Sequence, residues 1–169
     1  EILQTKRCIV REICLDDVDK LYEIYADPSI TLYMEGLYAK KDEEIAYTRD
    51  YIRYQYGIYD FGMWIIEDEQ SGEVIGRAGL DLRPDREDAE LGYMIRKNRQ
   101  GQGLAYEVCT AILAYAKEEL GFEKLFARTR KENLASVMLL KKLGFHPVCA
   151  QSETKEADNA QIEYYIALS

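Results

Sequence analysis

A short glycine-bearing segment, Gln100-Gly101-Gln102-Gly103-Leu104-Ala105, has the residue types best suited to binding chemistry. It stands between a predicted strand and a predicted helix, and its glycines let the backbone approach a ligand closely. The first amides of a helix have no partner within the helix and lie at the positive end of its dipole. The segment therefore predicts a site for a phosphate or pyrophosphate group.

The glycine segment fits two familiar nucleotide motifs poorly. A Walker A loop needs a Lys-Ser/Thr pair after its second glycine, and none stands there. A dinucleotide fingerprint needs a third glycine at position 106, where Tyr106 stands, and it belongs early in a parallel fold. An ordinary turn without a ligand stays open as an alternative.

The cysteines and the histidine do not form a recognisable metal site. Cys8, Cys14, Cys109 and Cys149 include no Cys-x-x-Cys pair, and the one histidine, His146, lies near only Cys149 in the sequence. We therefore expect no metal. Free thiols favour a reducing, cytoplasmic location. A Cys–His nucleophile built on His146 is not favoured, because no third group that would orient it can be named.

Length and composition predict one domain covering residues 1–169. Hydrophobic residues make up 47% and charged residues 31%, which is typical of a globular chain rather than a disordered one. Neither a transmembrane helix nor a signal peptide is expected. The net charge of -9 argues against nucleic acid or an anionic membrane as a partner. It fits a cationic acceptor, although acidity also serves solubility.

Hydrophobic periodicity predicts the elements of the N-terminal half. A strand is expected over Cys8–Ile13, and a helix begins after Asp16, with Asp19 in a capping-box-like position. A second helix is expected over Glu43–Tyr56. Three strands with short links follow, so they should be antiparallel neighbours. These strands are expected over 62–67, 74–82 and 89–95.

The C-terminal half should alternate helices and strands after the glycine segment. Gly121 and Gly144 are expected to end its two helices. The helices are expected over Leu104–Leu120 and Asn133–Leu143, and the strands over Lys124–Thr129, Phe145–Ala150 and Ile162–Leu168.

Five stretches of the sequence carry a family resemblance, in the order 5–11, 76–79, 89–105, 133–136 and 142–145. Residues 100–105 match the pattern Q/R-x-x-G-x-G/A, the pyrophosphate motif of the GNAT superfamily of N-acetyltransferases. Asn133 to Ser136, followed by Lys142 to Phe145, resembles the second signature of that superfamily. The first two stretches resemble its RimJ/RimL-like branch.

The resemblance implies an α/β (α+β) GNAT-like fold and acetyl-CoA as co-substrate. Its central sheet would be mixed and largely antiparallel, with about seven strands, a splay between strands 4 and 5, and flanking helices. Backbone groups near Met94 and Ile95 would bond the pantetheine amides, although core packing is the alternative for both side chains. Amides of the glycine segment would hold the pyrophosphate.

Asn133 and Ser136 should stand beside the coenzyme. Asn133 suits a helix N-cap, and the resemblance also points it toward the pantetheine arm or a nearby water. Ser136, in the same first turn, would lie near the coenzyme thiol as proton donor to the leaving thiolate, or be a small helix residue without chemistry. Many family members carry a tyrosine acid four residues further on, where this sequence has Leu140. The identity of the acid therefore stays open.

The implied reaction is direct attack of a neutral amine on the thioester in a ternary complex. Amines are mostly protonated at neutral pH, since the reference pKa is about 7.7–8.0 for an α-amine and about 10.4 for lysine. A general base or a water relay should therefore help. Glu90 is the expected base, because strand alternation places it on one face with Gly92 and Met94. A solvent-facing Glu90 is the alternative, and Asp81 is a second candidate base.

The acceptor entrance is expected between the N-terminal helices, with Tyr33 and Glu35 lining it. Tyr47, Tyr51 and Tyr54 recur at helical spacing, which suits an aromatic wall or a stripe that faces the core. The acceptor should be a primary amine, either a small cationic molecule or a protein N-terminus. A homodimer is expected only by analogy.

Two other functions remain open from the sequence. Leu140, in place of the usual tyrosine, is compatible with a non-catalytic acyl-CoA-binding or sensing domain. A nucleotide-dependent oxidoreductase would need NADH to compete with acetyl-CoA for the glycine segment.

Overall fold

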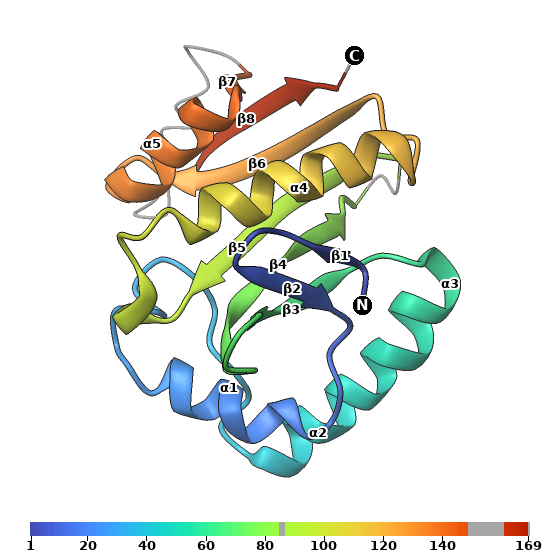
Figure 1. The fold of residues 1–169 in the computed structure, drawn as a ribbon, viewed down its shortest axis with the longest axis vertical. Helices are drawn as coiled ribbons and strands as arrows, with labels where there is room; N and C mark the ends of the chain where they lie inside the picture. Colours follow the sequence, from blue (N-terminus) through green and yellow to red (C-terminus); the bar gives the residue numbers. More distant parts are fainter. Residues whose placement is uncertain (85–86, 149–160, 169) are drawn as a thin grey trace.

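A computed structural model describes residues 1–84, 87–148 and 161–168 of the chain (Figure 1). Its centre is an eight-stranded sheet in the order β1-β2-β3-β4-β5-β6-β8-β7. All neighbouring strands are antiparallel except β5 and β6, which confirms the predicted mixed sheet. The strands are β1 (Leu3–Gln4), β2 (Cys8–Arg11), β3 (Met63–Asp68), β4 (Val74–Leu82), β5 (Ala89–Ile95), β6 (Lys124–Arg130), β7 (His146–Pro147) and β8 (Gln161–Ala167).

Helices flank this sheet, with α4 lying along β5 and α5 beside β6 (Figure 1). The helices α1 and α2 lie at the lower end of the view, and the chain rises from α2 to α3 at the right. The helical elements are α1 (Asp17–Tyr25), α2 (Lys41–Asp50), the π-helix η1 (Tyr51–Tyr56), α3 (Gly57–Tyr59), the 3-10 turn η2 (Lys97–Arg99), α4 (Leu104–Glu118) and α5 (Leu134–Leu143).

Strand alternation assigns the helices to two faces of the sheet. Trp64 on β3 is the register partner of Ala78 on β4, and its ring meets that of Tyr115 on α4 edge-on at 5.7 Å between centroids. Arg77, the next residue of β4, points to the other face, where its side chain is hydrogen-bonded to Tyr25 of α1. The helix α4 and the N-terminal helices therefore cover opposite faces.

The parallel strands β5 and β6 separate soon after they meet. Their one register pair is Glu90 with Phe126, although β5 continues to Ile95 and β6 to Arg130. A parallel pair needs a crossover connection, which α4 provides. Beyond Leu91, the β6-facing edge of β5 has no strand partner among the described residues. This divergence is the predicted splay: the predicted strands 4 and 5 are β5 and β6, because the sheet also contains β1, which was not predicted.

Two helix starts show how local capping departs from or follows the prediction. Asp16 occupies the N-cap position of α1, as predicted, but its side chain makes no cap hydrogen bond among the described residues. Asp17 is used instead: its carboxylate accepts from the Cys14 amide at 2.8 Å and forms an ion pair with Arg11 at 2.8 Å. Asn133 is an N-cap as predicted, since its side chain accepts from the Ser136 amide at 3.3 Å.

Two predicted elements differ in extent. The helix expected over Glu43–Tyr56 becomes the π-helix η1 after Asp50. With this wider winding, the Tyr56 hydroxyl donates to the Met63 carbonyl and the Tyr51 hydroxyl accepts from the Met63 amide. The strand expected over Phe145–Ala150 is short, because β7 covers only its second and third residues. Positions 149 and 150, including Cys149, lie outside the described residues.

Candidate active site

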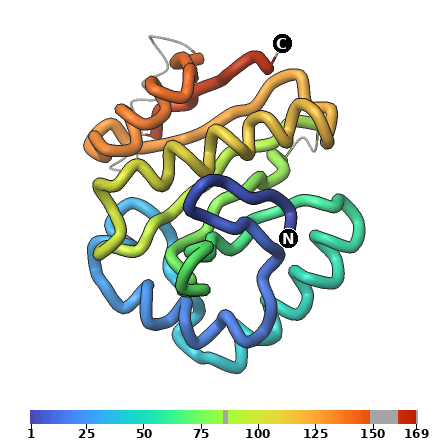
Figure 2. The backbone as a smooth tube through the Cα atoms, in the orientation of Figure 1, coloured from blue at the N-terminus to red at the C-terminus, as the bar shows by residue number. Residues whose placement is uncertain are grey.

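A cleft of about 1210 Å³ opens at the splay between β5 and β6. Figure 2 shows the segment that links α1 to α2 rising beside the loop before α4, and residues of both line the cleft. The strands β4, β5 and β6 and the helix α5 supply further walls, and α1, α2 and η1 contribute side chains as well. The cleft therefore joins the glycine segment to side chains from the N-terminal half.

The glycine segment forms one end of this cleft. Gly101 and Gly103 adopt left-handed backbone conformations, with φ of 75° and 77°, and Gly103 occupies the N-cap position of α4. Residues with a side chain rarely adopt this conformation. The backbone amides that open α4 lack partners within the helix, and Leu104 and Ala105 line the cleft. These features fit the pyrophosphate of a coenzyme.

Gln100 and Gln102 hold the glycine segment in place through hydrogen bonds to β5 and to Arg7. The Gln100 amide nitrogen donates to the Ile95 carbonyl at 2.8 Å, which ties the segment to the end of β5. Gln102, the one member of the segment outside the described cleft lining, accepts at its backbone carbonyl from Arg7 at 2.9 Å. Arg7 also forms an ion pair with Glu107 on α4 at 2.8 Å. No pattern in the sequence indicated this clamp, because Arg7 lies far from Gln102 and Glu107 along the chain.

Met94 and Ile95, the predicted pantetheine-binding positions, line the cleft from β5, and both residues are almost fully buried. Their side chains thus pack in the core, while the adjacent edge of β5 is the one that β6 leaves open. An extended chain carrying amide groups could add along that edge by hydrogen bonding, as a strand does. The residues present therefore fit the pantetheine arm of a coenzyme as well as its pyrophosphate.

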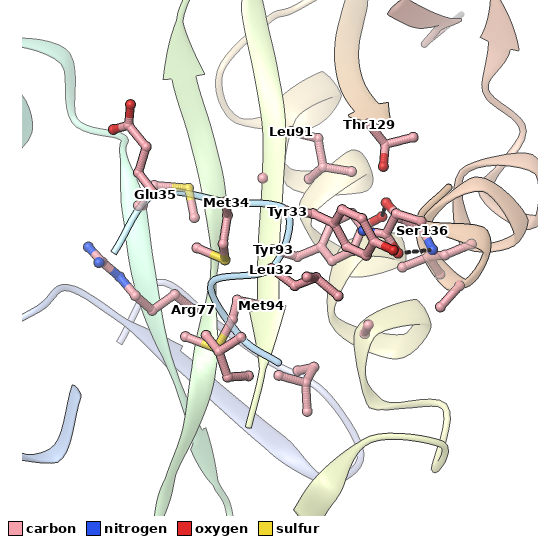
Figure 3. A pocket seen from close by; sticks show the side chains of 18 of the residues that line it. Leu32, Tyr33, Met34, Glu35, Arg77, Leu91, Tyr93, Met94, Thr129 and Ser136 are labelled. Carbon is pink, nitrogen blue, oxygen red and sulfur yellow. Dashed lines mark hydrogen bonds between the residues drawn. The ribbon is translucent and has the colours of Figure 1, made fainter. Parts of the chain in front are cut away.

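A pair of hydroxyl groups spans the cleft between β5 and α5. The Tyr93 hydroxyl is hydrogen-bonded to the Ser136 Oγ, and both residues line the cleft (Figure 3). Burial raises the pKa of Tyr93 to about 12, so its phenol is protonated at neutral pH. Leu140, where many family members carry a tyrosine, is buried. The structure thus brings a tyrosine to Ser136 from a strand, a residue that the sequence did not indicate.

The two candidate bases lie opposite each other on neighbouring strands. Asp81 on β4 is the register partner of Glu90 on β5, and Asp81 lines the cleft. Glu90 is outside the described cleft lining: its carboxylate lies 2.9 Å from Arg128 Nε and 3.8 Å from Arg83 Nη1. Alternation had placed Glu90 on the correct face, but Asp81 is the carboxylate that the cleft exposes.

The electrostatic surroundings of Asp81 favour its neutral form. Burial raises the pKa of this carboxyl, and the nearby Glu90 charge adds to the increase, while Arg77 and the Tyr51 hydroxyl oppose it. The Tyr51 hydroxyl lies 3.5 Å from the Asp81 carboxylate and accepts from the Met63 amide at 2.7 Å. A carboxylate with a raised pKa at a cleft surface is a suitable proton acceptor.

The other end of the cleft is aromatic and carries both signs of charge. Tyr33 and Glu35, the predicted acceptor residues, both line the cleft; Figure 3 shows Tyr33 beside the Tyr93–Ser136 pair and Glu35 farther from it. Tyr47 and Tyr51 also line the cleft. A stripe facing the core is wrong for Tyr47 and Tyr54, since 48% and 52% of their surfaces are exposed. Tyr54 lies outside the described lining, so the aromatic wall has two of the three tyrosines.

The remaining chemical candidates lie away from this cleft. Within residues 1–84, 87–148 and 161–168, no group of His, Cys, Asp and Glu is arranged to hold a metal ion. Cys8 and Cys109 are buried, and burial raises the pKa of Cys109 to about 12, which leaves it an unreactive thiol. None of the helices in these ranges is long and apolar enough to span a membrane.

Comparison with known proteins gives a consistent result. The family model for the acetyltransferase (GNAT) domain matches residues 7–146. The uncharacterized N-acetyltransferase p20 of Bacillus licheniformis is 28% identical, over 98% of this chain and 94% of its own. The RimL ribosomal L7/L12 α-N-protein acetyltransferase, solved with coenzyme A, has a TM-score of 0.80 at 16% identity, covering 98% of this chain and 97% of its own. A spermidine N-acetyltransferase SpeG chimera from Vibrio cholerae and hSSAT has a TM-score of 0.78 at 20% identity, covering 95% of each chain.

Proposed function

We propose that the chain transfers an acetyl group from acetyl-CoA to a primary amine within a ternary complex. The chain belongs to the GNAT acetyltransferase family, since the family model matches residues 7–146. That the chain is an acetyl-CoA-dependent N-acetyltransferase follows from the family; the acceptor and the roles of individual residues form the proposal. The observation that carries it is a single cleft in which the glycine segment, the Tyr93–Ser136 pair and Asp81 share one surface.

The coenzyme would occupy the splay. Amides from Gly101 to Ala105 would hold the pyrophosphate, and the open edge of β5 near Met94 and Ile95 would bond the pantetheine amides. Asn133 would stand close to that arm while its side chain caps α5. When bound, acetyl-CoA supplies the thioester whose carbonyl carbon the amine attacks and whose sulfur leaves.

Asp81 would accept the proton of the attacking amine, directly or through one water. Its place on the cleft surface and its raised pKa support this role over that of Glu90. Glu90 would instead influence Asp81 from the adjacent strand, because its negative charge favours the protonated carboxyl. Backbone N–H groups of the open β5 edge would stabilise the oxyanion that forms at the carbonyl.

The Tyr93–Ser136 pair would return a proton to the departing thiolate. Ser136 lies in the first turn of α5, and its hydroxyl can pass a proton to the sulfur while it receives one from the Tyr93 phenol. The carbon–sulfur bond breaks as the carbon–nitrogen bond is completed, and the phenolate left on Tyr93 regains its proton from solvent. This assignment fills the position left open by Leu140.

The acceptor would be a small amine or a protein N-terminal amine. Tyr33 and Glu35 would line its entrance, and Tyr47 and Tyr51 would form one wall. The two solved structures compared above act on a protein N-terminus and on spermidine, according to their names. Both kinds of acceptor therefore belong in the first screen.

Calorimetric titration with acetyl-CoA, beside dephospho-CoA and NADH, tests the coenzyme site. Saturable binding of acetyl-CoA, far tighter than that of NADH, is expected. Release of free thiol across a broad panel of amines then tests turnover. Absence of coenzyme binding would contradict the proposal outright, whereas binding without turnover on any amine would support the sensing domain instead.

A further inference from the structure

Arg77 is a cation at the end of the cleft where the acceptor is proposed to bind, here called the acceptor half, and no carboxylate among the described residues forms an ion pair with it. It lines the cleft from the middle of β4, and its Nε is buried without a hydrogen-bond partner in the described part of the chain. The other two arginines of the lining are both paired. Arg99 lies 2.9 Å from Asp68, and Arg128 lies 2.9 Å from Glu90.

The groups around Arg77 do not neutralise it. Burial raises the pKa of Tyr51 and raises that of Tyr56 to about 12, so both phenols are uncharged at neutral pH. Burial lowers the pKa of Arg77, but the neighbouring tyrosines, with Tyr25 first, outweigh it and the guanidinium stays charged. The charge of Arg77 lowers the pKa of Asp81. The two side chains nevertheless form no ion pair within 4.0 Å in the described part of the chain.

The backbone beneath Arg77 is tightly held. A Cβ at Gly76 would lie 2.0 Å from the Met94 carbonyl oxygen, and one at Gly79 would lie 2.0 Å from the Gly62 carbonyl oxygen. These close approaches fix β4 between β3 and β5. The guanidinium is therefore presented from a rigid strand, on the opposite side of β5 from the Tyr93–Ser136 pair (Figure 3).

A guanidinium nitrogen that is buried without a hydrogen-bond partner, as Nε of the half-buried Arg77 is, has lost water without gaining a protein acceptor, and this is costly. Its planar fork matches a carboxylate and can bind it through two parallel hydrogen bonds. Asp81 lies four residues along the same face of β4, with its Cα roughly 13 Å away. A molecule that presents an amine to Asp81 and an anion to Arg77 would satisfy both groups.

We propose that Arg77 binds a carboxylate of the acceptor, so that the substrate is a primary amine that also carries a carboxylate, several bonds from the reacting nitrogen. This proposal rests on the proposed function and narrows it. The carboxylate could belong to a free amino acid or to an acidic side chain that follows a peptide N-terminus. In both cases a polyamine would be a poor substrate, because its second cation would meet Arg77.

The test compares matched amines at saturating acetyl-CoA by their kcat/KM. One arm uses 4-aminobutyrate and 6-aminohexanoate against their amides. The other uses C-terminally amidated Ser-Glu-Ala against Ser-Gln-Ala, which identifies a peptide source. For the wild type, we expect kcat/KM to be about 10-fold or more higher for the carboxylate than for its matched amide. The series that shows this difference, free amino acids or peptides, identifies the source of the carboxylate.

Two substitutions and one control connect that preference to Arg77. Arg77→Met should abolish the preference, and Arg77→Lys should keep a weaker one, since an ammonium retains the charge without the fork. Arg53→Met, on the exposed surface of η1, removes the same charge outside the cleft lining and should leave the preference intact. Thermal unfolding and acetyl-CoA affinity, measured for each variant, establish that the protein is folded.

The outcomes separate this inference from the proposed function. Equal turnover of the carboxylate and the amide by the wild type overturns the inference, as does a preference that survives in folded Arg77→Met. A uniform loss with every acceptor, or a loss of acetyl-CoA affinity in Arg77→Met, also overturns it, because Arg77 would then serve the reaction centre or the coenzyme. If coenzyme binds but no amine is acetylated, the proposed function itself fails.

Discussion

The coenzyme half and the acceptor half of the cleft are built by different means. The coenzyme half relies on backbone groups of one contiguous stretch, 100–105, and on the free edge of β5. The acceptor half relies on side chains that come from α1, α2, η1, β4 and the segment between α1 and α2. A backbone site depends on local conformation and tolerates many side chains. A side-chain site depends on the identity of a few residues and can change its ligand by single substitutions.

The largest effect is expected from Asp81→Asn in the acceptor half. Loss of the proposed base should lower kcat by roughly 10²- to 10⁴-fold, because a positioned proton acceptor contributes about that much. Acetyl-CoA affinity, measured by calorimetry, should stay unchanged, because the coenzyme half is independent of this side chain. Glu90→Gln is the matched control from the adjacent strand, and its effect on kcat should be much smaller.

The reverse order would refute the assignment of the base. If Glu90→Gln lost more activity than Asp81→Asn, the carboxylate paired with Arg128 would be the base, as the sequence alone had predicted. If both variants kept full activity, water would remove the proton without either carboxylate.

A second consequence concerns pH. Asp81 must be ionised to accept a proton, and its pKa is raised above the ordinary value of about 3.9. Activity should therefore be present above the raised pKa and fall as the pH drops through it, by up to about tenfold per pH unit. The profile of kcat/KM, measured with an acceptor of low amine pKa, should show this acid limb, and Asp81→Asn should lack it. Acetyl-CoA affinity that fell over the same range would place the titrating group in the coenzyme half instead.

The sequence predicted the coenzyme half better because its features are local. The positive φ at Gly101 and Gly103 and the helix start behind them are encoded within six residues, so a pattern could represent the arrangement. The strand Ala89–Ile95 and the cap at Asn133 are equally local, and both agree with the structure.

The acceptor half escaped prediction because it depends on register and packing between distant segments. Asp81 and Glu90 are register partners, but Glu90 is paired with Arg128 of β6 while Asp81 lines the cleft, and no sequence pattern distinguishes the two. The Tyr93–Ser136 pair exists because α5, packed beside β6, places Ser136 opposite Tyr93 of β5, and no spacing in the sequence records that contact. The π-helix likewise accompanies tertiary hydrogen bonds, which join Tyr51 and Tyr56 to the Met63 backbone, and no local propensity predicted it.

A smaller effect is expected where the two halves meet. Tyr93→Phe should lower kcat by roughly 10-fold, because Ser136 and water can still supply the proton. Ser136→Ala should have a similar effect, and the double variant should cost little more than either alone, since both residues act on one proton. Burst and steady-state release of free thiol would measure this. Fully additive losses would mean that the two hydroxyls act separately.

The smallest effect is expected from Gly103→Ala. Comparison with Gly72→Ala distinguishes the loss of a backbone binding site from backbone strain alone. Gly103→Ala forces a side chain into a left-handed conformation, at about 1–2 kcal/mol, and nothing closer than Arg7 Nη2 at 3.7 Å would obstruct its Cβ. Gly72→Ala imposes the same strain at φ of 73°, in a turn with no neighbour within 4 Å of the Cβ and outside the cleft. Both variants should lose similar unfolding free energy, but Gly103→Ala alone should weaken acetyl-CoA binding, by about 5- to 10-fold. Equal coenzyme affinity in the two variants would show that the conformation at Gly103 is not what holds the pyrophosphate, and the coenzyme half would then also depend on side chains.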